Sequence, residues 1–331
     1  MKIDVFPHIL PIKYKEALHK ATGVGFYQGT HAAIPTLYDL DYRFRIMDKF
    51  DDLMQVLTIA SPPVENCKDP QKATELAKLA NDGMAELVQK YPDRFAAAIA
   101  CLPMNNIDAA LVELDRAIKD LKFRGVQIFT PINDKPLDLP EFMPLYDKMC
   151  QYNLPILLHP QRSPDFPDYR TEKTSKYTIH GILGWPYETS IAMIRLVVSG
   201  VLEKYPTLKF ITHHAGAMIP FFEKRVTGWL DGDEMLFGNR DKEKLRRPTI
   251  EYFKMFYADT AIYGHTSGLM CAYDFFGAEH LLFGTDMPFD HQLGLKYTRE
   301  TIESIERMAI SETEKRMIFA DNARRLLRLA V

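Results

Sequence analysis

Four histidines and one aspartate follow short apolar runs, and their side chains suit the binding of a divalent metal ion. They are His8, His159, the adjacent pair His213 and His214, and Asp286. Imidazole and carboxylate groups are good ligands for zinc and similar ions, and a catalytic zinc takes about three protein ligands and keeps one position open. We therefore predict that His8, His159 and Asp286 bind one divalent metal. Zn²⁺ is the expected ion and Mn²⁺ the alternative.

The pair His213 and His214 is expected to supply an acid–base group. Side chains alternate along a strand, so only one of the two should point inward while the strand stays regular. The inward ring is then available for proton transfer. Packing is the competing explanation, because His8 could cap an outer loop and His159 could be a satisfied core histidine. A buried Asp286 without a metal or a cation beside it would be costly.

The elements that must position these residues alternate between strand and helix. Apolar, β-branched runs predict strands at 2–6, 53–60, 95–101, 125–129, 155–159, 209–213, 255–259 and 281–286. Helical spacing of apolar residues predicts helices at 69–90, 108–121, 142–152, 189–204, 219–232, 266–276, 297–310 and 311–330. This alternation indicates a parallel sheet with right-handed crossovers. Eight units favour one closed (β/α)8 barrel, a TIM-type α/β fold whose chemistry lies at the C-terminal strand ends.

Two long segments interrupt the alternation. Residues 11–45 are expected to form an insertion over the barrel mouth after the first strand, and residues 160–188 a loop that shapes a substrate pocket. No glycine-rich loop follows the first strand, which disfavours a dinucleotide fold. No linker or repeat divides the chain, so residues 1–331 are predicted to form one domain with helices at its C-terminal end.

Composition excludes several classes of partner. The 331 residues are 47% hydrophobic and carry a net charge of −3, which gives no reason to expect nucleic acid or an anionic membrane as partner. No apolar run is long enough to span a bilayer, and no signal peptide is recognisable at the first residues. The four cysteines are scattered, without metal-binding or redox spacing. Free thiols and a cytoplasmic location are expected.

Six motifs in family order resemble the amidohydrolase superfamily, in its branch related to aminocarboxymuconate-semialdehyde decarboxylase. They are Ile3-Asp-Val-Phe-Pro-His8, His159-Pro160, Gly184-Trp-Pro-Tyr-Glu188, Thr212-His-His-Ala-Gly-Ala-Met-Ile-Pro220, Tyr257-Ala-Asp-Thr260 and Leu282-Phe-Gly-Thr-Asp-Met-Pro288. The resemblance implies a distorted (β/α)8 barrel that binds one divalent metal, usually zinc. It also implies a homodimer, in which a neighbouring subunit can contribute an arginine to the site.

The resemblance assigns the ligands and exposes one departure. The family's first-strand His-x-His falls on Phe6 and His8, its fifth-strand histidine on His159 and its eighth-strand aspartate on Asp286. Phenylalanine cannot ligate a metal. Either the other three residues hold the ion with water at the remaining positions, or the site has become weak or empty.

Two further roles follow from the register of the resemblance. The family's sixth-strand histidine lies six residues before a proline, so Pro220 places it on His214 rather than His213. The family arginine that binds a substrate carboxylate falls five residues beyond that proline, on Arg225. A solvated helix face is the competing explanation for Arg225.

The leading functional prediction is a metal-dependent non-oxidative decarboxylase acting on an aromatic or muconate-semialdehyde-type carboxylic acid. Loss of CO₂ leaves electron density on carbon, which requires an electrophile and a proton donor. His214 and Asp286 would move the proton, and Arg225 would bind a carboxylate. One alternative is a metal-dependent hydrolase of a lactone, an amide or a C–C bond. The other is a metal-free barrel that binds a ligand without turnover, for which Phe6 is the main support.

Overall fold

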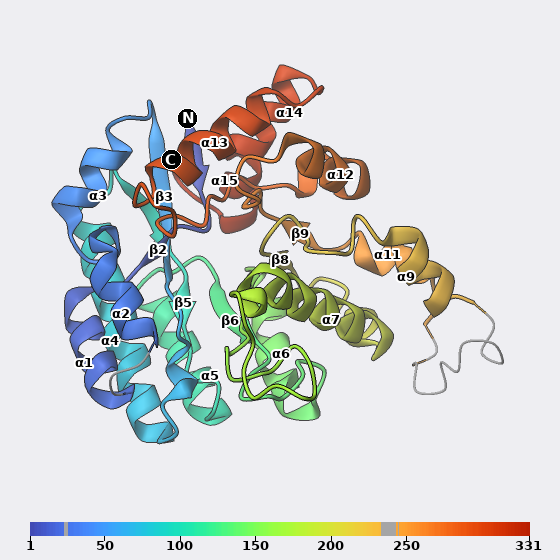
Figure 1. Cartoon of the computed structure of the whole chain (residues 1–331), viewed down its shortest axis with the longest axis horizontal. Helices are drawn as coiled ribbons and strands as arrows, with labels where there is room; N and C mark the ends of the chain where they lie inside the picture. Colours follow the sequence, from blue (N-terminus) through green and yellow to red (C-terminus); the bar gives the residue numbers. More distant parts are fainter. Residues whose placement is uncertain (23–25, 233–242, 244) are drawn as a thin grey trace.

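The computed structural model describes residues 1–22, 26–232, 243 and 245–331, and its strands form two parallel sheets (Figure 1). In the first sheet, β3 (Leu53–Ile59) pairs with β1 (Lys2–Asp4), β2 (His8–Ile9) and β4 (Phe95–Ala98). The second sheet has the order β5 (Ala100–Cys101), β6 (Val126–Thr130), β7 (Ile156–Pro160), β8 (Phe210–Thr212) and β9 (Tyr257–Ala258). The predicted parallel α/β fold is confirmed.

Backbone hydrogen bonds join the two sheets at both sides. On one side the chain runs directly from β4 into β5, and Ile99 N between them donates to Leu57 O of β3 (2.9 Å). On the other side, Leu282 N donates to Ala258 O of β9, and Val5 N donates to Phe283 O, both at 2.9 Å. The segment 281–283 therefore lies between β9 and β1, in the position predicted for the eighth strand.

This eighth segment differs from the strand predicted at 281–286. Only Leu281 forms a ladder bridge, to Ala258. Beyond it, side-chain oxygens accept hydrogen bonds from the backbone. Gly284 N donates to the Thr260 hydroxyl (3.1 Å), and Thr285 N donates to Asp4 Oδ1 (3.1 Å). The run is extended and buried as its sequence indicates, but side-chain partners replace a regular ladder.

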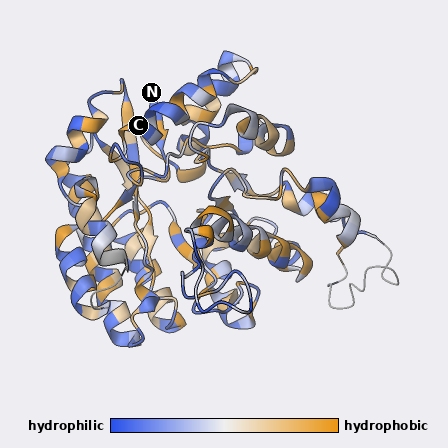
Figure 2. Cartoon of the chain, viewed as in Figure 1, coloured by the Kyte–Doolittle hydropathy of each residue, from blue (hydrophilic) through white to orange (hydrophobic). Residues whose placement is uncertain are grey.

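Helices cover the sheets, and the helices predicted at 69–90, 108–121, 142–152 and 266–276 are found within two residues of those bounds, whereas the one predicted at 311–330 contains two separate α-helices. The α-helices are α1 (Ile12–Thr22), α2 (Phe26–Ala33), α3 (Leu40–Met47), α4 (Pro70–Lys90), α5 (Ile107–Lys119), α6 (Met143–Tyr152), α7 (Trp185–Val198), α8 (Val201–Lys204), α9 (Glu223–Leu230), α11 (Thr249–Phe253), α12 (Thr266–Phe276), α13 (Leu295–Glu306), α14 (Glu312–Arg316) and α15 (Asn322–Leu327). Figure 2 shows hydrophobic and hydrophilic residues interleaved around these helices, as amphipathic packing requires.

Local sequence signals account for the start of α4 and for the break between α7 and α8. The Asp69 carboxylate accepts from Gln71 N (3.0 Å) and Pro70 follows it, so α4 begins where a capping residue and an N1 proline would start a helix. The helix predicted at 189–204 instead divides into α7 and α8. Gly200 between them has φ 74°, a left-handed conformation that glycine adopts readily.

The predicted insertion at 11–45 is helical and supports the first strand. Helix α1 packs against α4 in the outer layer. From α3, the fully buried Arg43 donates through Nη1 to His8 O (2.8 Å) and through Nε to Gln55 Oε1 (2.8 Å). The insertion thus fixes the backbone of one predicted ligand.

Two other sequence expectations can be compared with the structure. All four cysteines are outside disulfides. Among the described residues, no helix is both long and apolar enough to cross a membrane.

Candidate metal centre and active site

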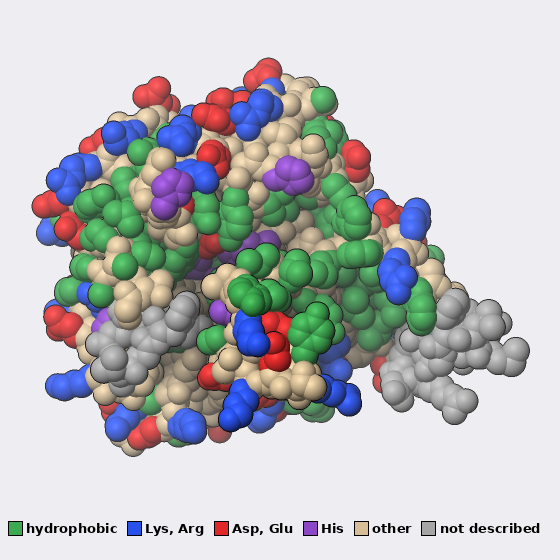
Figure 3. Space-filling view, in the orientation of Figure 1, with side chains coloured by type: hydrophobic (Ala, Val, Ile, Leu, Met, Phe, Trp, Pro, Cys, Tyr) green, Lys and Arg blue, Asp and Glu red, His purple; other side chains and the backbone are tan. Residues whose placement is uncertain are grey.

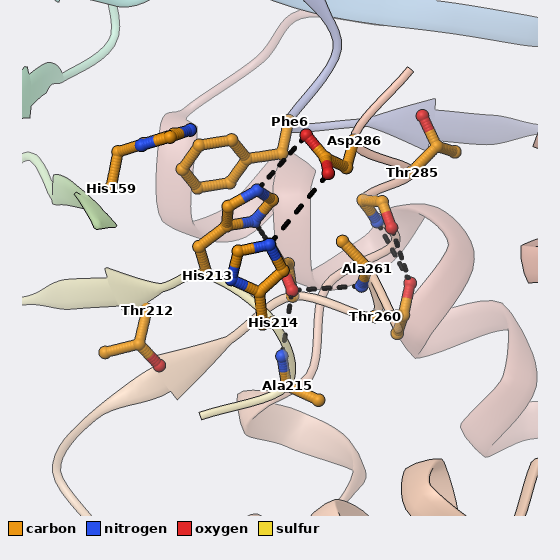
Figure 4. Close-up of polar contacts among 12 residues, drawn as sticks. Phe6, His159, Thr212, His213, His214, Ala215, Thr260, Ala261, Thr285 and Asp286 are labelled. Carbon is orange, nitrogen blue, oxygen red and sulfur yellow. Dashed lines mark hydrogen bonds and ion pairs between the residues drawn. The ribbon is translucent and has the colours of Figure 1, made fainter. Parts of the chain in front are cut away.

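Three of the predicted histidines converge on one buried point. Ligand atoms of His8, His159 and His213 all lie within 4.8 Å of one another, and so do those of His213, His214 and Asp286. His8 belongs to β2 and His159 to β7, while the pair His213–His214 directly follows β8. Figure 4 shows Phe6, His213, His214 and Asp286 facing one another, and in Figure 3 histidine side chains lie in a hollow of the molecular surface.

The Nδ1 atoms of three rings are engaged by oxygen acceptors. His8 Nδ1 lies 3.2 Å from Ile59 O, and His159 Nδ1 lies 2.7 Å from Pro160 O. His213 Nδ1 is bonded to the Asp259 carboxylate. Because an oxygen acceptor requires N–H, each Nδ1 carries a proton, and in the neutral form of each ring the lone pair is on Nε2. Within the described part of the chain, the buried Nε2 atoms of His8 and His213 have no hydrogen-bond partner.

Asp286 lies where these Nε2 atoms meet. Its Oδ1 is 3.3 Å from His8 Nε2 and 3.4 Å from His213 Nε2, and its Oδ2 accepts from the Tyr263 hydroxyl (3.0 Å). Burial acts to raise the pKa of Asp286, but the neighbouring imidazoles of His213, His214 and His8 outweigh burial and hold that pKa well below its usual value. Asp286 is therefore an ionised carboxylate.

Both members of the His213–His214 pair reach Asp286, which differs from the expectation that only one would point inward. His214 Nε2 lies 3.9 Å from Oδ2. Strand β8 ends at Thr212 and His214 has φ 58°, so strand alternation no longer applies there. Burial acts to lower the pKa of His213, but Asp259 and Asp286 raise it to about 9. Burial and the neighbouring His213 lower the pKa of His214.

Comparison with known proteins identifies the family. The amidohydrolase family model matches residues 8–329. The chain belongs to the amidohydrolase family. It is 31% identical over 296 residues to a gamma-resorcylate decarboxylase of Polaromonas sp. (strain JS666 / ATCC BAA-500), covering 87% of each chain. It is 26% identical to the 2-amino-3-carboxymuconate-6-semialdehyde decarboxylase of Dictyostelium discoideum, covering 99% of this chain and 92% of that one.

A solved structure extends the likeness to the fold. A dihydroxybenzoic acid decarboxylase from Polaromonas sp. JS666, with bound manganese and the inhibitor 2-nitroresorcinol, matches with a TM-score of 0.81 and 28% identity. The match covers 99% of this chain and 96% of that one. The predicted family and barrel-type fold are confirmed, and the relatives support the predicted carboxy-lyase class.

In this amidohydrolase, Phe6 forms an apolar wall of the histidine cluster. Its ring stacks on His213 with centroids 4.1 Å apart and an interplanar angle of 16°. It also lies 5.8 Å from the ring of His8 and 6.0 Å from that of His159. The position at which the resemblance predicts a first ligand is thus filled by a side chain that contacts the cluster without offering a lone pair.

Aromatic side chains surround the histidines. Phe129 and Trp185 lie 4.9 and 5.7 Å from the His159 ring, and Phe289 lies 5.5 Å from the His8 ring. Other aromatics of the 160–188 loop are largely exposed, namely Phe166, Tyr169 and Tyr177. The flat, apolar surroundings of the site therefore come mainly from residues next to the strand ends.

Arg225 lies apart from both histidine groups. It is on α9, with its guanidinium 5.6 Å from the Trp229 ring centroid, and lines an apolar groove of about 360 Å³ with Tyr187 and Phe222. Another arginine, Arg162, comes three residues after His159 and forms an ion pair with Glu188 (2.5 Å).

Sequence reasoning missed two residues that contact the cluster, Asp259 and Tyr263. Asp259 had a readable signal, because it ends a predicted strand as Asp286 does. Tyr263 had none, since it lies in a loop and itself adopts a left-handed conformation with φ 56°.

Proposed function

We propose that this amidohydrolase is a metal-dependent non-oxidative decarboxylase of an aromatic or muconate-semialdehyde-type carboxylic acid. The observation that carries the proposal is the meeting of buried, unpartnered imidazole Nε2 atoms beside the ionised Asp286. Buried nitrogen atoms without partners destabilise a fold unless something else fills the position. In a chain whose relatives decarboxylate aromatic and muconate-type acids, that something is a divalent ion.

His8, His159 and Asp286 would hold the ion. Their donor set of imidazoles and one carboxylate fits Zn²⁺, and Mn²⁺ is the alternative, as in the related dihydroxybenzoic acid decarboxylase. The Nδ1 partners of His8 and His159 fix the tautomer that ligation needs. When bound, the ion would act as a Lewis acid and polarise a substrate oxygen.

The chain's own residues would manage the proton. In the reaction, a proton replaces the carboxylate on the same carbon, and the electrons of the broken C–C bond form the new C–H bond. His214 Nε2 and Asp286 Oδ2 are 3.9 Å apart, so a small movement of either would pass a proton between them. Phe129, Trp185 and Phe289 would hold a flat substrate and limit access of water.

Arg225 and the assembly form a linked part of the proposal. Arg225 lines an apolar groove between α7 and α9, and a second copy that covers this groove would place Arg225 at the subunit interface, where its guanidinium would bind a substrate carboxylate. We therefore propose a homodimer, which light scattering at micromolar concentration would reveal as twice the chain mass.

Four cysteines without disulfides support a cytoplasmic location.

The test is release of labelled CO₂ by metal-reconstituted protein. Carboxyl-labelled 2,6-dihydroxybenzoate, 5-carboxyvanillate and 2-amino-3-carboxymuconate-6-semialdehyde are the first substrates, because related proteins act on such acids. We expect CO₂ from at least one, abolished by a chelator and restored by Zn²⁺ or Mn²⁺. Metal-dependent cleavage of lactones or amides without CO₂ would favour the hydrolase instead. Turnover unaffected by the chelator would contradict the proposed mechanism.

A further inference from the structure

We propose that His213 is a metal ligand in this protein and replaces the one lost at Phe6. This inference rests on the proposed metal-dependent function and deepens it. The family pattern offers a first-strand ligand at position 6, where this chain has a phenylalanine. The ring of Phe6 lies flat against His213, so the residue that removes one ligand directly contacts its substitute.

The position of His213 is the first argument. It is the one residue shared by the two potential metal-binding groups found among the described residues, His8–His159–His213 and His213–His214–Asp286. Its Nε2 and that of His8 approach the same oxygen, Asp286 Oδ1, at 3.4 and 3.3 Å. Ligand bonds of about 2.0–2.1 Å place neighbouring ligand atoms of a tetrahedral zinc about 3.3–3.4 Å apart. The distances of 3.3 and 3.4 Å from these two nitrogens to Asp286 Oδ1 match that ligand spacing.

The support behind His213 is the second argument. Its Nδ1 is bonded to Asp259, a carboxylate that is fully buried. Asp259 Oδ1 in turn accepts from Ala215 N and Ala261 N, both at 3.0 Å. A carboxylate fixed in this way orients the imidazole, keeps its proton on Nδ1 and increases the basicity of Nε2. This is the usual arrangement behind a metal-binding histidine.

His214 provides the contrast within the same tripeptide. Its Nε2 faces the other oxygen of Asp286 at the longer distance of 3.9 Å. Its Nδ1 has no hydrogen-bond partner in the described residues, so no carboxylate fixes its ring. His214 therefore remains free to exchange a proton, while His213 is held as a ligand.

The experiment is a Co²⁺ titration of chelator-stripped protein, followed by visible absorption and calorimetry. Wild type is compared with His213→Ala, Asp259→Asn, His214→Ala and the double variant Phe6→Ala with His213→Ala, and thermal unfolding without metal checks each fold. We expect His213→Ala to bind Co²⁺ at least about 100-fold more weakly with an altered spectrum, and Asp259→Asn about 10–100-fold more weakly. His214→Ala should bind within a few-fold of wild type.

A rescue variant tests whether His213 replaces the ligand that is lost at position 6. Phe6→His in the His213→Ala background should recover at least about tenfold in Co²⁺ affinity, whereas Phe6→Ala in the same background should recover none. Wild-type affinity and spectrum in His213→Ala would overturn the inference while leaving the three-ligand site of the proposed function intact. If His213→Ala fails to fold, unchanged affinity in Asp259→Asn would overturn it. Absence of binding in folded wild type would overturn both.

Discussion

Two buried polar clusters of this protein differ in whether their hydrogen bonds are complete. Between α4 and α5, Asn81 donates to Cys101 O (2.9 Å) and Glu113 Oε1 (2.6 Å), and its own Oδ1 accepts from Cys101 N (2.8 Å). Arg116 completes this cluster with two bonds to Glu113 (2.7 and 2.8 Å). At the strand ends, by contrast, His8 Nε2 and His213 Nε2 meet at Asp286 without a hydrogen-bond partner among the residues described.

Whether the hydrogen bonds are complete distinguishes buried polar groups that stabilise the fold from buried polar groups that bind a ligand. A complete network satisfies its buried groups and fastens helices to the sheet. A cluster whose lone pairs converge leaves groups unsatisfied, and the protein tolerates that cost where a ligand can fill the position. Substitutions should accordingly reduce stability in the first cluster and activity in the second.

The largest effect is expected for His159→Ala. Loss of a direct ligand should lower kcat/KM by about 10³-fold or more, because even partners behind a ligand are worth about 10–100-fold. Unfolding of the metal-free protein should change less than in variants of the first cluster, since the His159 side chain makes one hydrogen bond, to Pro160 O. Steady-state kinetics and calorimetric melting test this together. Activity within tenfold of wild type would contradict the functional role assigned to the histidine cluster.

The converse effect is expected for Glu113→Ala. Arg116 and Asn81 would lose their shared partner, and the free energy of unfolding should fall by about 3 kcal/mol. Activity per folded molecule should be unchanged. Urea denaturation and kinetics below the transition would show this, with Glu113→Gln as the matched variant that retains part of the bonding. Loss of activity without loss of stability would contradict the structural role.

A smaller effect is expected for Tyr263→Phe. The hydroxyl donates to Asp286 Oδ2, and a hydrogen bond to a charged group is worth about 1.5–3 kcal/mol. Without it Asp286 should be less well oriented, and kcat should fall about tenfold with the melting temperature nearly constant. Tyr297→Phe is the control, because Tyr297 stacks on Tyr263 at 4.3 Å and its ring would remain. Equal losses in both variants would argue against a specific role for the bond.

The smallest effect concerns Glu65, a buried acid outside both clusters. Burial raises its pKa from 4.5 to about 7, so the folded state holds the proton more tightly than the unfolded state. Stability should therefore fall as pH rises from about 4.5 to 7 and stay lower above that range. Glu65→Gln should reduce this fall by about 1–3 kcal/mol. Denaturation at pH 5 and pH 8 measures it, and an identical pH dependence in both proteins would contradict the shift.

Much of the fold followed from local signals. Helix α12 has the predicted bounds, and α4 begins after Asp69 because capping and proline chemistry are local. Strand β8 ends one residue earlier than predicted, and β9 is two residues long. These ends depend on side-chain bonds between distant segments, such as those that join Asp259 to His213 and Ala215 N, which no local pattern contains.

The site was predictable wherever a residue ended an apolar run. His8, His159 and Asp286 were found in this way, and the structure brings His8 close to both of the others. The inward turn of both His213 and His214 was not predictable, because it depends on a left-handed residue after the strand. The position of Arg225 in a groove on α9 likewise follows from tertiary packing, not from its spacing to Pro220.

Calorimetric titration of Mn²⁺ into chelator-stripped wild-type protein tests most directly whether the converging lone pairs form a metal site. We expect saturable binding of one ion per chain, and none in a folded His159→Ala variant measured under the same conditions. Folded wild-type protein that shows no saturable binding of Mn²⁺, and none of Zn²⁺, would contradict the metal-dependent account of this cluster.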